Sequence, residues 1–571
     1  MSRKTAWLVA AGVAAVAIGA AAVGGVALLV RGGGRTGDVF AGGGYLALEL
    51  DGALPEEPAS AWSGFLESRP PSVRGLVEAV DRAARDRRVK GLVLRLGSLD
   101  IGWARAQELH DALQRFRGTG KPSWAHLESP GNLEYFLATG CARIAASPTA
   151  LLDVSGLAAE VTFYKGTLDK LGVEAQFEGV GRYKTAPNQL TEKGFTPPHR
   201  EQMEALVEGL FGQYLDAVAN GRKLPPATVK ALIDRGPFLA EEAKQAGLVD
   251  ELLYLDEIES KLAAGQRLLP AAYVKAARGM GFDNRPKLGL VYAVGDLVPG
   301  ESQESPFGGL YAGADTIVRG LREAREDDSV RAIVLRVDSP GGSGTASDAV
   351  WREVQLARRA KPVIASMGDY AASGGYYVAM GADLIVAQPG TITGSIGVFS
   401  GKLSLRGLYQ KLGMSQETVK RGRHAALFSG SGPWSDEERA KVRAMNEAFY
   451  ATFVSKAAEG RKKTTGEIEA VAEGRVWTGH AAAVAGLVDL LGGLDEAVRV
   501  ARERARIAPG QEVRLVVLPA RKGFIETLME RQDEDVSVRS LGREAISLLR
   551  WGTAFSDRGP IARLPFELAI R

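Results

Sequence analysis

Cysteine is almost absent from this sequence, and neither sign of charge is in large excess. The 571 residues include a single cysteine, Cys141, which excludes an intramolecular disulfide. We interpret Cys141 as a small buried side chain, since no Cys/His cluster has the spacing of zinc ligands. Lys and Arg number 71 against 68 Asp and Glu, a near balance that gives no electrostatic footprint for nucleic acid. The composition therefore argues against a zinc domain and against a nucleic-acid partner.

One apolar run is long enough to cross a membrane. It covers residues 5–30 without a charge, with Arg3 and Lys4 before it and Arg31 after it. About 20 apolar residues span the hydrocarbon core, whereas the apolar part of a cleaved signal peptide usually has about 7–15. We therefore predict an uncleaved signal anchor at 1–40. Small residues in the run leave cleavage as the alternative, and the flanking charges nearly cancel, so they do not orient the segment.

The rest of the chain is too long for one hydrophobic core and contains an internal repeat. The segment VKGLVLRLGS from Val89 matches VRAIVLRVDS from Val330, and YFLATGCARIAASP from Tyr135 matches YYVAMGADLIVAQP from Tyr376, both at an offset of 241 residues. Two related halves are therefore predicted. The predicted units after the anchor are a first repeat at 41–265, a linker at 266–286, a second repeat at 287–520 and an amphipathic tail at 521–571.

Strand and helix signals alternate in each half. The short apolar runs GLVLRL and AIVLRV predict buried parallel strands, and each follows a charged helical segment. Longer helices are predicted from His199 and from Ser435, where Ser-Asp-Glu-Glu forms an N-cap with acidic first-turn residues. This alternation indicates an α/β layered fold with right-handed crossovers.

Two glycine-lined turns distinguish the second half from the first. The strand AIVLRVD leads into Ser-Pro-Gly-Gly, ending at Gly342, and the next strand leads into Ser373 and Gly374 at the start of a helix. Backbone N–H groups at such a turn favour a developing negative charge, as acyl transfer through an oxyanion requires. The position corresponding to Ser373 in the first half is Asn132. The first half therefore has the scaffold without a nucleophile.

A serine nucleophile also needs a base, and no histidine lies in a convincing triad setting with an aspartate. The five histidines, which we interpret as surface or structural residues, are His110, His126, His199, His424 and His480. Lysine can replace histidine as the base when burial lowers its pKa toward neutrality. Composition alone does not select one lysine from the others.

The motifs of this chain resemble those of the signal peptide peptidase A family, in its long, two-repeat, membrane-anchored bacterial form. They occur in the order of that family and cover almost the whole chain after the apolar run. The matching segments are GRYKTA at 181–186, DSPGGS at 338–343, GDYAASGGYYVAMGAD at 368–383, TGSIGV at 393–398 and two AGLVD segments. The resemblance implies tandem Clp/crotonase-like domains and a Ser–Lys dyad serine endopeptidase that uses no cofactor.

The resemblance also implies a role for individual residues. Ser373 matches the nucleophile, and Lys184 matches the general-base lysine, which the first repeat supplies in the long form. Ser395 matches the serine that orients this lysine. Gly342 and Gly374 match the two oxyanion donors.

The repeat gives an independent reason to combine the two halves. The second-half position that corresponds to Lys184 is His424, so each half lacks one member of the dyad. We therefore expect one shared site, with His424 as base the alternative. One departure from the family is Thr185, which stands where relatives commonly have serine, and the acidic residue that usually follows soon after is missing.

The resemblance further implies substrates, assembly and location. The expected substrates are apolar peptides, chiefly remnant signal peptides, and the expected assembly is a homotetramer. The expected location is the bacterial inner membrane, with the catalytic body outside the cytoplasm. Two rival functions remain at this point: an inactive scaffold that binds peptides, and a crotonase-type acyl-CoA enzyme in which the same oxyanion geometry stabilises an enolate.

Overall fold

The computed structural model describes residues 43–57, 71–262, 265–277, 284–304, 309–520, 561–563 and 569–570. The anchor predicted at 1–40 lies outside these residues, and so does most of the tail predicted at 521–571. Among the helices that are described, none has both the length and the apolar character of a membrane span.

The first repeat is built on a parallel six-stranded sheet in the order β10-β1-β2-β3-β4-β9. Its strands are β1 (Gly44–Gly52), β2 (Val89–Leu99), β3 (Ser123–Leu127), β4 (Arg143–Ala146), β9 (Glu251–Leu252) and β10 (Gln266–Leu268). Its helices include α2 (Val73–Arg85), α3 (Trp103–Arg117), α4 (Asn132–Ala138), α7 (Pro197–Arg222), α8 (Pro226–Ile233), α9 (Ala240–Gln245) and α10 (Leu255–Leu262). Buried side chains of α2, α3, α4 and α7 share one core with the sheet.

The segment predicted as a linker contributes to this first sheet. Its first residues form β10, which pairs with β1, and they are followed by α11 (Pro270–Ala277), which packs on α2. Pairing and packing of this kind make β10 and α11 part of the first repeat rather than a free connection.

The second repeat is built on an eight-stranded sheet with the order β21-β19-β17-β15-β11-β23, in which β18 extends from β17 and carries β22. Its strands are β11 (Lys287–Val294), β15 (Val330–Ser339), β17 (Val363–Ala372), β18 (Leu384–Ala387), β19 (Ile392–Gly394), β21 (Val476–Thr478), β22 (Leu490–Leu491) and β23 (Arg514–Leu518). Its helices include α12 (Ala314–Glu326), α13 (Gly344–Ala360), α14 (Gly374–Ala379), α16 (Asp436–Arg461), α17 (Thr465–Glu469), α18 (Gly479–Val484) and α19 (Leu494–Arg504).

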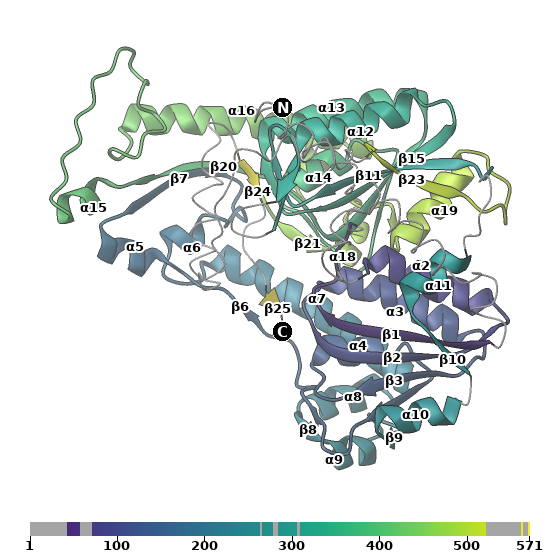
Figure 1. The fold of residues 1–571 in the computed structure, drawn as a ribbon. Coiled ribbons are helices and arrows are strands. Elements are labelled where there is room, and N and C mark those ends of the chain that lie inside the picture. Colours follow the sequence, from purple (N-terminus) through teal and green to yellow (C-terminus); the bar gives the residue numbers. More distant parts are fainter. Residues whose placement is uncertain are drawn as a thin grey trace, which may run out of the picture.

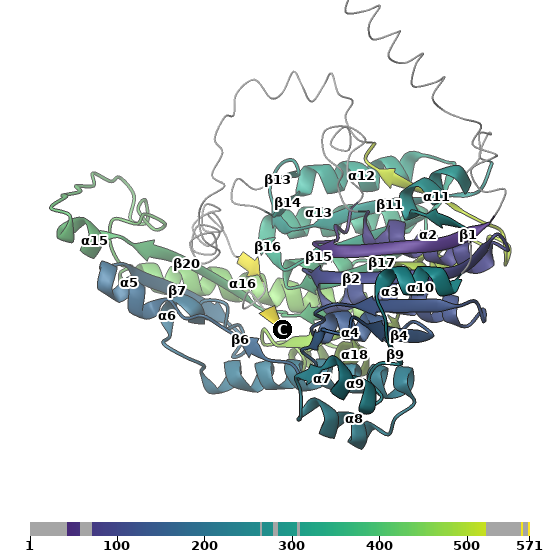
Figure 2. The same cartoon turned by 60° about the horizontal axis from the view of Figure 1, so that its bottom comes forward.

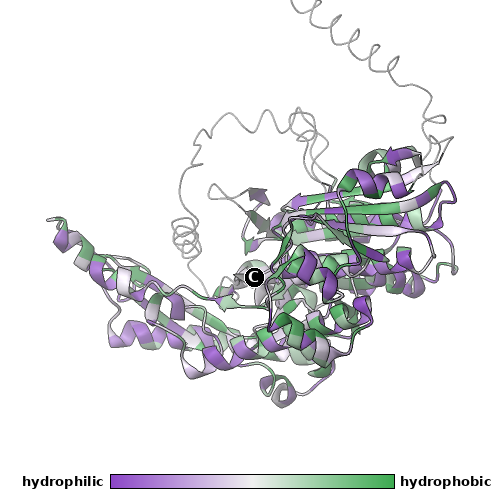
Figure 3. Cartoon of the chain, turned by 90° about the horizontal axis from the view of Figure 1, so that it is seen from below, coloured by the Kyte–Doolittle hydropathy of each residue, from purple (hydrophilic) through white to green (hydrophobic). Residues whose placement is uncertain are grey.

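The apolar runs of the sequence explain why these strands are central. All but one residue of β15 is buried, because helices cover both faces of its sheet. The predicted helix from Ser435 is present as α16, where the Ser435 hydroxyl accepts from the Glu438 N–H as part of a capping box. Figure 3 shows hydrophobic colouring along many strands and hydrophilic colouring on many outer helical turns.

The internal repeat is confirmed by equivalent hydrogen bonds in the two halves. Tyr135 donates its hydroxyl to the Leu248 carbonyl at 2.7 Å, and Tyr376 donates to the Leu487 carbonyl at 3.0 Å. Each tyrosine lies on the short helix that follows the third strand, in chain order, of the main sheet of its repeat. The two halves therefore share side-chain packing as well as strand order.

A third sheet joins the two repeats, with the order β13-β14-β12-β16-β24-β20-β7. The remaining strands are β5 (Leu151–Leu152), β6 (Ala159–Glu160), β7 (Glu174–Val180), β8 (Phe238–Leu239), β12 (Asp296–Val298), β13 (Gln303–Glu304), β14 (Leu310–Gly313), β16 (Gly341–Ser343), β20 (Val398–Ser404), β24 (Ile561–Arg563) and β25 (Ala569–Ile570). First-repeat β7 pairs antiparallel with second-repeat β20 along its whole length. With α5 (Lys165–Leu171), α6 (Asn188–Thr191) and α15 (Arg406–Lys411), strands β7 and β20 form an arm that projects from the body (Figures 1 and 2).

Buried ion pairs also join the repeats. Arg336 on β15 is fully buried and donates through Nε to Glu56 Oε1 at 2.6 Å, while its Nη1 lies 2.7 Å from Glu108 Oε1. Glu56 follows β1 and Glu108 lies on α3, so both carboxylates come from the first repeat. Burial raises the pKa of Glu108 to about 7, with Arg336 opposing that shift.

We predict that Arg336→Leu lowers the free energy of unfolding by about 3–5 kcal/mol, because two buried carboxylates lose their cation. Arg319→Leu is the matched control, since Arg319 pairs with Glu301 at the surface, and its cost is expected to stay below about 1 kcal/mol. Denaturant unfolding of both variants measures the difference. Equal costs in the two variants would show that the buried pairs do not hold the repeats together.

Candidate active site

Ser373 lies at the junction between a central strand and a short helix. It follows β17 directly and is the N-cap of α14, with a side chain that is fully buried. Its backbone has φ 54° and ψ −110°, a conformation that a residue other than glycine rarely adopts. The Ser373 N–H donates a hydrogen bond of 2.8 Å to the Gly394 carbonyl, which fixes this backbone conformation. Surrounding structure must maintain such a strained turn, and strain of this kind is common at functional sites.

Lys184 reaches this serine from the other repeat. It lies on the loop after β7, and its side chain crosses to the end of β17. Lys184 Nζ donates to Ser373 Oγ at 2.7 Å and to Ser395 Oγ at 2.9 Å. Ser395, directly after β19, also has a left-handed backbone with φ 52°. The structure therefore brings together three of the residues that the sequence singled out.

The environment of Lys184 favours a neutral amine. The lysine is buried, with 6% of its surface exposed, and this burial lowers its pKa well below the ordinary value, because the ammonium form loses its hydration. No nearby carboxylate contributes to that shift. A neutral amine within hydrogen-bond reach of a hydroxyl can take its proton, so the pair has the chemistry of a base and a nucleophile.

A loop of the second repeat holds the Lys184 loop in position. Gly474 has φ 77°, and a Cβ at this position would lie 2.5 Å from the backbone nitrogen of Lys184. The Gly474 N–H donates to the Ile396 carbonyl at 2.7 Å, and the neighbouring Arg475 carbonyl accepts from the Ser395 N–H at 2.7 Å. One short segment thus contacts both the lysine loop and the Ser395 loop. The sequence analysis missed Gly474, since nothing local distinguishes it from the many other glycines.

Thr185, the departure from the family pattern, has a structural partner. Its hydroxyl accepts a hydrogen bond of 2.7 Å from Gln202 Nε2 on α7, and the same amide donates to the Tyr183 carbonyl at 3.2 Å. Gln202 is fully buried. A threonine hydroxyl therefore satisfies this amide and ties the lysine loop to α7.

The two glycines expected to donate to an oxyanion lie on backbone that flanks Ser373. Gly374 is the first residue of α14, where the N–H groups have no partner within the helix. Gly342 is in β16, which packs against α14, and its φ of 155° lies outside the range that other residues favour. Burial and pairing thus put both glycines beside the nucleophile turn.

Charged residues behind the nucleophile strand were not found from the sequence. Asp369 on β17 accepts hydrogen bonds of 2.9 Å from the N–H groups of Gly102 and Arg105, at the start of first-repeat helix α3. The Arg105 side chain pairs with Asp369 and lies 3.9 Å from Asp338 Oδ2. Burial raises the pKa of Asp338 to about 6. The strand that carries Ser373 is therefore clamped to the other repeat, a contact that no local sequence pattern encodes.

Other candidate residues do not join this site. Within the described residues, no hydrogen bond links His424 to Ser373. Asn132 exchanges hydrogen bonds of 2.9 and 3.1 Å with the backbone of Gly156, a structural contact at the start of α4. Cys141 is buried, and burial raises the pKa of its thiol to about 12.

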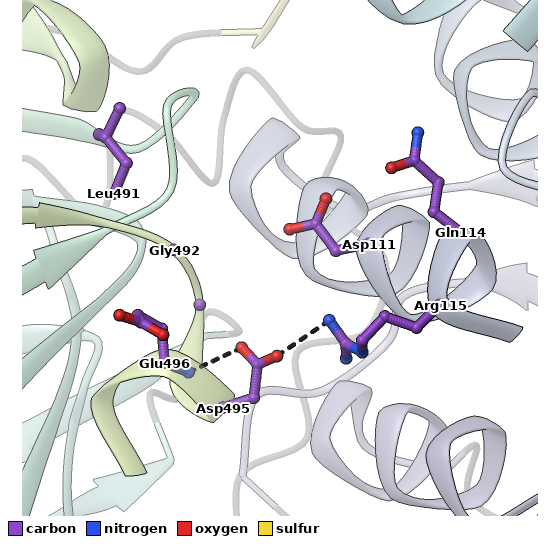
Figure 4. A pocket seen from close by; sticks show the side chains of 8 residues that line it. Asp111, Gln114, Arg115, Leu491, Gly492, Asp495 and Glu496 are labelled. Atoms are coloured by element: carbon purple, nitrogen blue, oxygen red, sulfur yellow. Dashed lines mark hydrogen bonds and ion pairs between the residues drawn. The ribbon is translucent and has the colours of Figure 1, made fainter. Parts of the chain in front are cut away.

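A pocket of about 430 Å³ lies elsewhere, at the seam between the repeats (Figure 4). Arg115 on α3 forms an ion pair of 3.0 Å there with Asp495 on α19. The residues that line it are polar for the most part and include none of Lys184, Ser373 and Ser395. This pocket is therefore separate from the buried Lys–Ser contact.

Comparison with known proteins agrees with a peptidase. The profile of peptidase family S49 matches residues 115–269 and again 355–508, once in each repeat. A chloroplastic serine protease, SPPA, of Arabidopsis thaliana is 33% identical over 488 residues, covering 83% of this chain and 71% of that protein. Protease 4 of Salmonella typhi is 32% identical over 494 residues, covering 81% and 79%. A solved ClpP1 chain of Listeria monocytogenes has 12% identity and a TM-score of 0.24 over 37% of this chain and 94% of its own, too low to carry an argument.

Burial of Lys184 has a consequence for stability. Its pKa is depressed in the folded state, so between that value and the unfolded value near 10.5 the unfolded chain binds more protons and stability rises with pH. We predict that Lys184→Met, which removes the desolvation cost, stabilises the protein by about 0.5–2 kcal/mol at pH 7. The gain should shrink as the pH approaches 10. Denaturant unfolding at pH 7 and pH 10 measures it, and a gain that is independent of pH would contradict a neutral buried lysine.

Proposed function

This chain belongs to peptidase family S49 and is a serine-type peptidase, and we propose that it cleaves peptide bonds with a dyad of Ser373 and Lys184. The observation that carries the proposal is the buried contact of 2.7 Å between Lys184 Nζ and Ser373 Oγ. Family membership removes the reason to consider a crotonase-type acyl-CoA enzyme. Retention of the lysine, both serines and both glycines argues against an inactive scaffold.

Acylation begins with proton transfer inside the dyad. Neutral Lys184 accepts the hydroxyl proton of Ser373 while Oγ attacks the carbonyl carbon of the scissile peptide bond. The carbonyl oxygen becomes an oxyanion, and the N–H groups of Gly342 and Gly374 stabilise it. When the tetrahedral intermediate collapses, the C–N bond breaks and the Lys184 ammonium returns its proton to the leaving amine. The products of this stage are the amine fragment and an acyl ester on Ser373.

Deacylation uses the same groups with water as the nucleophile. Lys184 takes a proton from a water molecule as its oxygen attacks the ester carbonyl, and the proton then passes to Ser373 Oγ as the ester bond breaks. Ser395, whose hydroxyl accepts from Lys184 at 2.9 Å, keeps the amine directed at the reacting atoms. No cofactor takes part in either stage.

We further propose that the substrates are apolar peptides at a membrane, chiefly remnant signal peptides. The support is the uncharged run at 5–30, which is long enough to anchor the chain beside such peptides. The family resemblance supports the rest of this proposal: a single-pass protein of the bacterial inner membrane, with its catalytic body outside the cytoplasm, that assembles as a homotetramer.

We predict that a fluorophosphonate probe labels the wild-type chain and that Ser373→Ala abolishes labelling, because the probe forms an ester with the nucleophile. Ser347→Ala is the matched control, since Ser347 is another buried serine of the second repeat whose hydroxyl donates to a backbone carbonyl at 2.8 Å. Gel fluorescence and intact mass measure the labelling. Equal labelling of wild type and Ser373→Ala would end the assignment.

The pH dependence follows from the depressed pKa of Lys184. Only the neutral amine acts as base, so kcat/KM for a quenched apolar peptide should fall as the pH drops below that pKa and reach a plateau above it. Both Lys184→Ala and Lys184→Arg should lower kcat/KM by about 100-fold or more, since arginine stays charged. Substantial activity in Lys184→Ala would show that another residue acts as the base. Adding His424→Ala to that variant tests whether His424 is this residue.

A further inference from the structure

A buried glutamine of the first repeat lies between the lysine loop and the second repeat. Gln202 is on α7 and is fully buried. Its Nε2 donates to the Tyr183 carbonyl at 3.2 Å and to the Thr185 hydroxyl at 2.7 Å, so it holds both neighbours of Lys184. Its Oε1 accepts from the N–H of Val476, on β21 of the second repeat, at 3.4 Å. One side chain therefore joins the lysine loop to a strand of the other repeat.

The partners of Gln202 fix the direction in which its amide points. A backbone carbonyl can only accept a hydrogen bond, and a backbone N–H can only donate one. Nε2 must therefore face the Tyr183 carbonyl, and Oε1 must face the Val476 N–H. A carboxylate of the same shape would only accept, and a methionine would do neither. The position thus requires a side chain that donates at one end and accepts at the other.

Strand β21 continues this connection toward the nucleophile. α7 packs against β21 (Figure 1), and Val476 on β21 lies opposite Gly394 on β19. Ser395 directly follows Gly394, and the Gly394 carbonyl accepts the hydrogen bond of 2.8 Å from the Ser373 N–H. The strand that Gln202 contacts is therefore one strand pairing away from the backbone that fixes Ser373.

A neighbouring residue of α7 contacts the lysine loop from the solvent side. Glu201 accepts from the Tyr183 hydroxyl at 2.7 Å and lies 3.2 Å from Arg475 Nη1, and its side chain is 45% exposed. Water competes for exposed interactions of this kind, so they hold a loop weakly. A buried hydrogen bond is costly to break, because its loss leaves a buried polar group without a partner. Gln202 is thus the residue of α7 that determines where the lysine loop lies.

We propose that Gln202 is a positioning residue for the general base, whose three hydrogen bonds hold the lysine loop so that the Lys184 amine stays buried and directed at Ser373. The inference rests on the proposed dyad and adds a residue that acts on it through the backbone, without touching the reacting atoms. The partners of Lys184 Nζ are uncharged oxygens of Ser373 and Ser395. A long, flexible side chain with such partners depends on its backbone for its direction.

The first test removes the amide and keeps its shape. Gln202→Met should lower kcat for a quenched apolar peptide about tenfold or more while KM stays within about twofold, since a misplaced base slows the chemical step rather than binding. Gln213→Met is the matched control, because Gln213 is also on α7 and also reaches the second repeat, donating to the Pro389 carbonyl at 3.1 Å. It should lose similar stability in denaturant unfolding and keep the wild-type kcat. An equal loss of kcat in both variants would show that Gln202 is only structural.

The pH profile gives a readout that a loss of stability alone does not move. Burial depresses the pKa of Lys184, so a loop that admits water should raise that pKa and shift the acid limb of kcat/KM to higher pH, by about 0.5–1 pH unit. Gln213→Met should keep the wild-type limb. An unshifted limb in Gln202→Met would overturn the proposal.

Variants at Thr185 test the same contact with a smaller change. Thr185→Val removes one of the three hydrogen bonds and should lower kcat about three- to tenfold, whereas Thr185→Ser keeps the hydroxyl and should retain the wild-type kcat. Adding Thr185→Val to Gln202→Met should lower kcat no further, because both changes break one contact. A wild-type kcat in Thr185→Val, or fully additive losses in the double variant, would show that Gln202 does not act through the lysine loop.

Crystal structures of the full chain separate this inference from the proposed function. In Gln202→Met the distance between Lys184 Nζ and Ser373 Oγ should exceed hydrogen-bond reach. If the wild-type chain hydrolyses no peptide and takes up no fluorophosphonate, the peptidase proposal fails, while the longer distance still upholds the positioning role. An active wild-type chain, with the distance and kcat both unchanged in Gln202→Met, would overturn the positioning role and leave the dyad intact.

Discussion

The buried contact between Lys184 Nζ and Ser373 Oγ is the constraint that explains how the two repeats are arranged around the proposed active site. It joins buried residues of the two repeats at 2.7 Å. Burial is costly for an amine, yet only burial makes this amine neutral and so able to act as a base. Desolvation of Lys184 therefore lowers the stability of the folded state and at the same time makes the amine basic enough to take a proton from serine. Functional sites often sacrifice stability for activity in this way.

Much of the surrounding architecture can be understood as what holds that contact. The pairing of β7 with β20 carries the lysine loop to the second repeat, and the backbone of Gly474 packs against Lys184 itself. On the other side, Asp369 caps helix α3 of the first repeat from the strand that leads to Ser373. A misplacement of catalytic groups by about 1 Å is costly in catalysis. The pairing of β7 with β20 and the buried ion pairs between the repeats therefore fix the position of the lysine relative to the serine as well as stabilising the fold.

Prediction from sequence succeeded where the signal was local or repeated. The apolar runs predicted the central strands β2 and β15, the serine cap predicted α16, and the offset between matching segments predicted two related halves. It failed where contacts are distant in sequence. The segment predicted as a linker pairs with β1 through β10, and β24 enters the third sheet from residues 561–563. Neither pairing leaves a periodic pattern, because each strand has only three residues.

The sequence by itself determined the kinds of element, the duplication, and the residue types available for chemistry, since hydrophobic period, glycine position and repeat offset are properties of short windows. Tertiary structure alone decided how close Lys184 lies to Ser373, how deeply that contact is buried, and which distant strands pair beside it. The reason is that a distance, a pKa and an occupied strand edge arise from atoms far apart along the chain, which become neighbours only when the two repeats close around them.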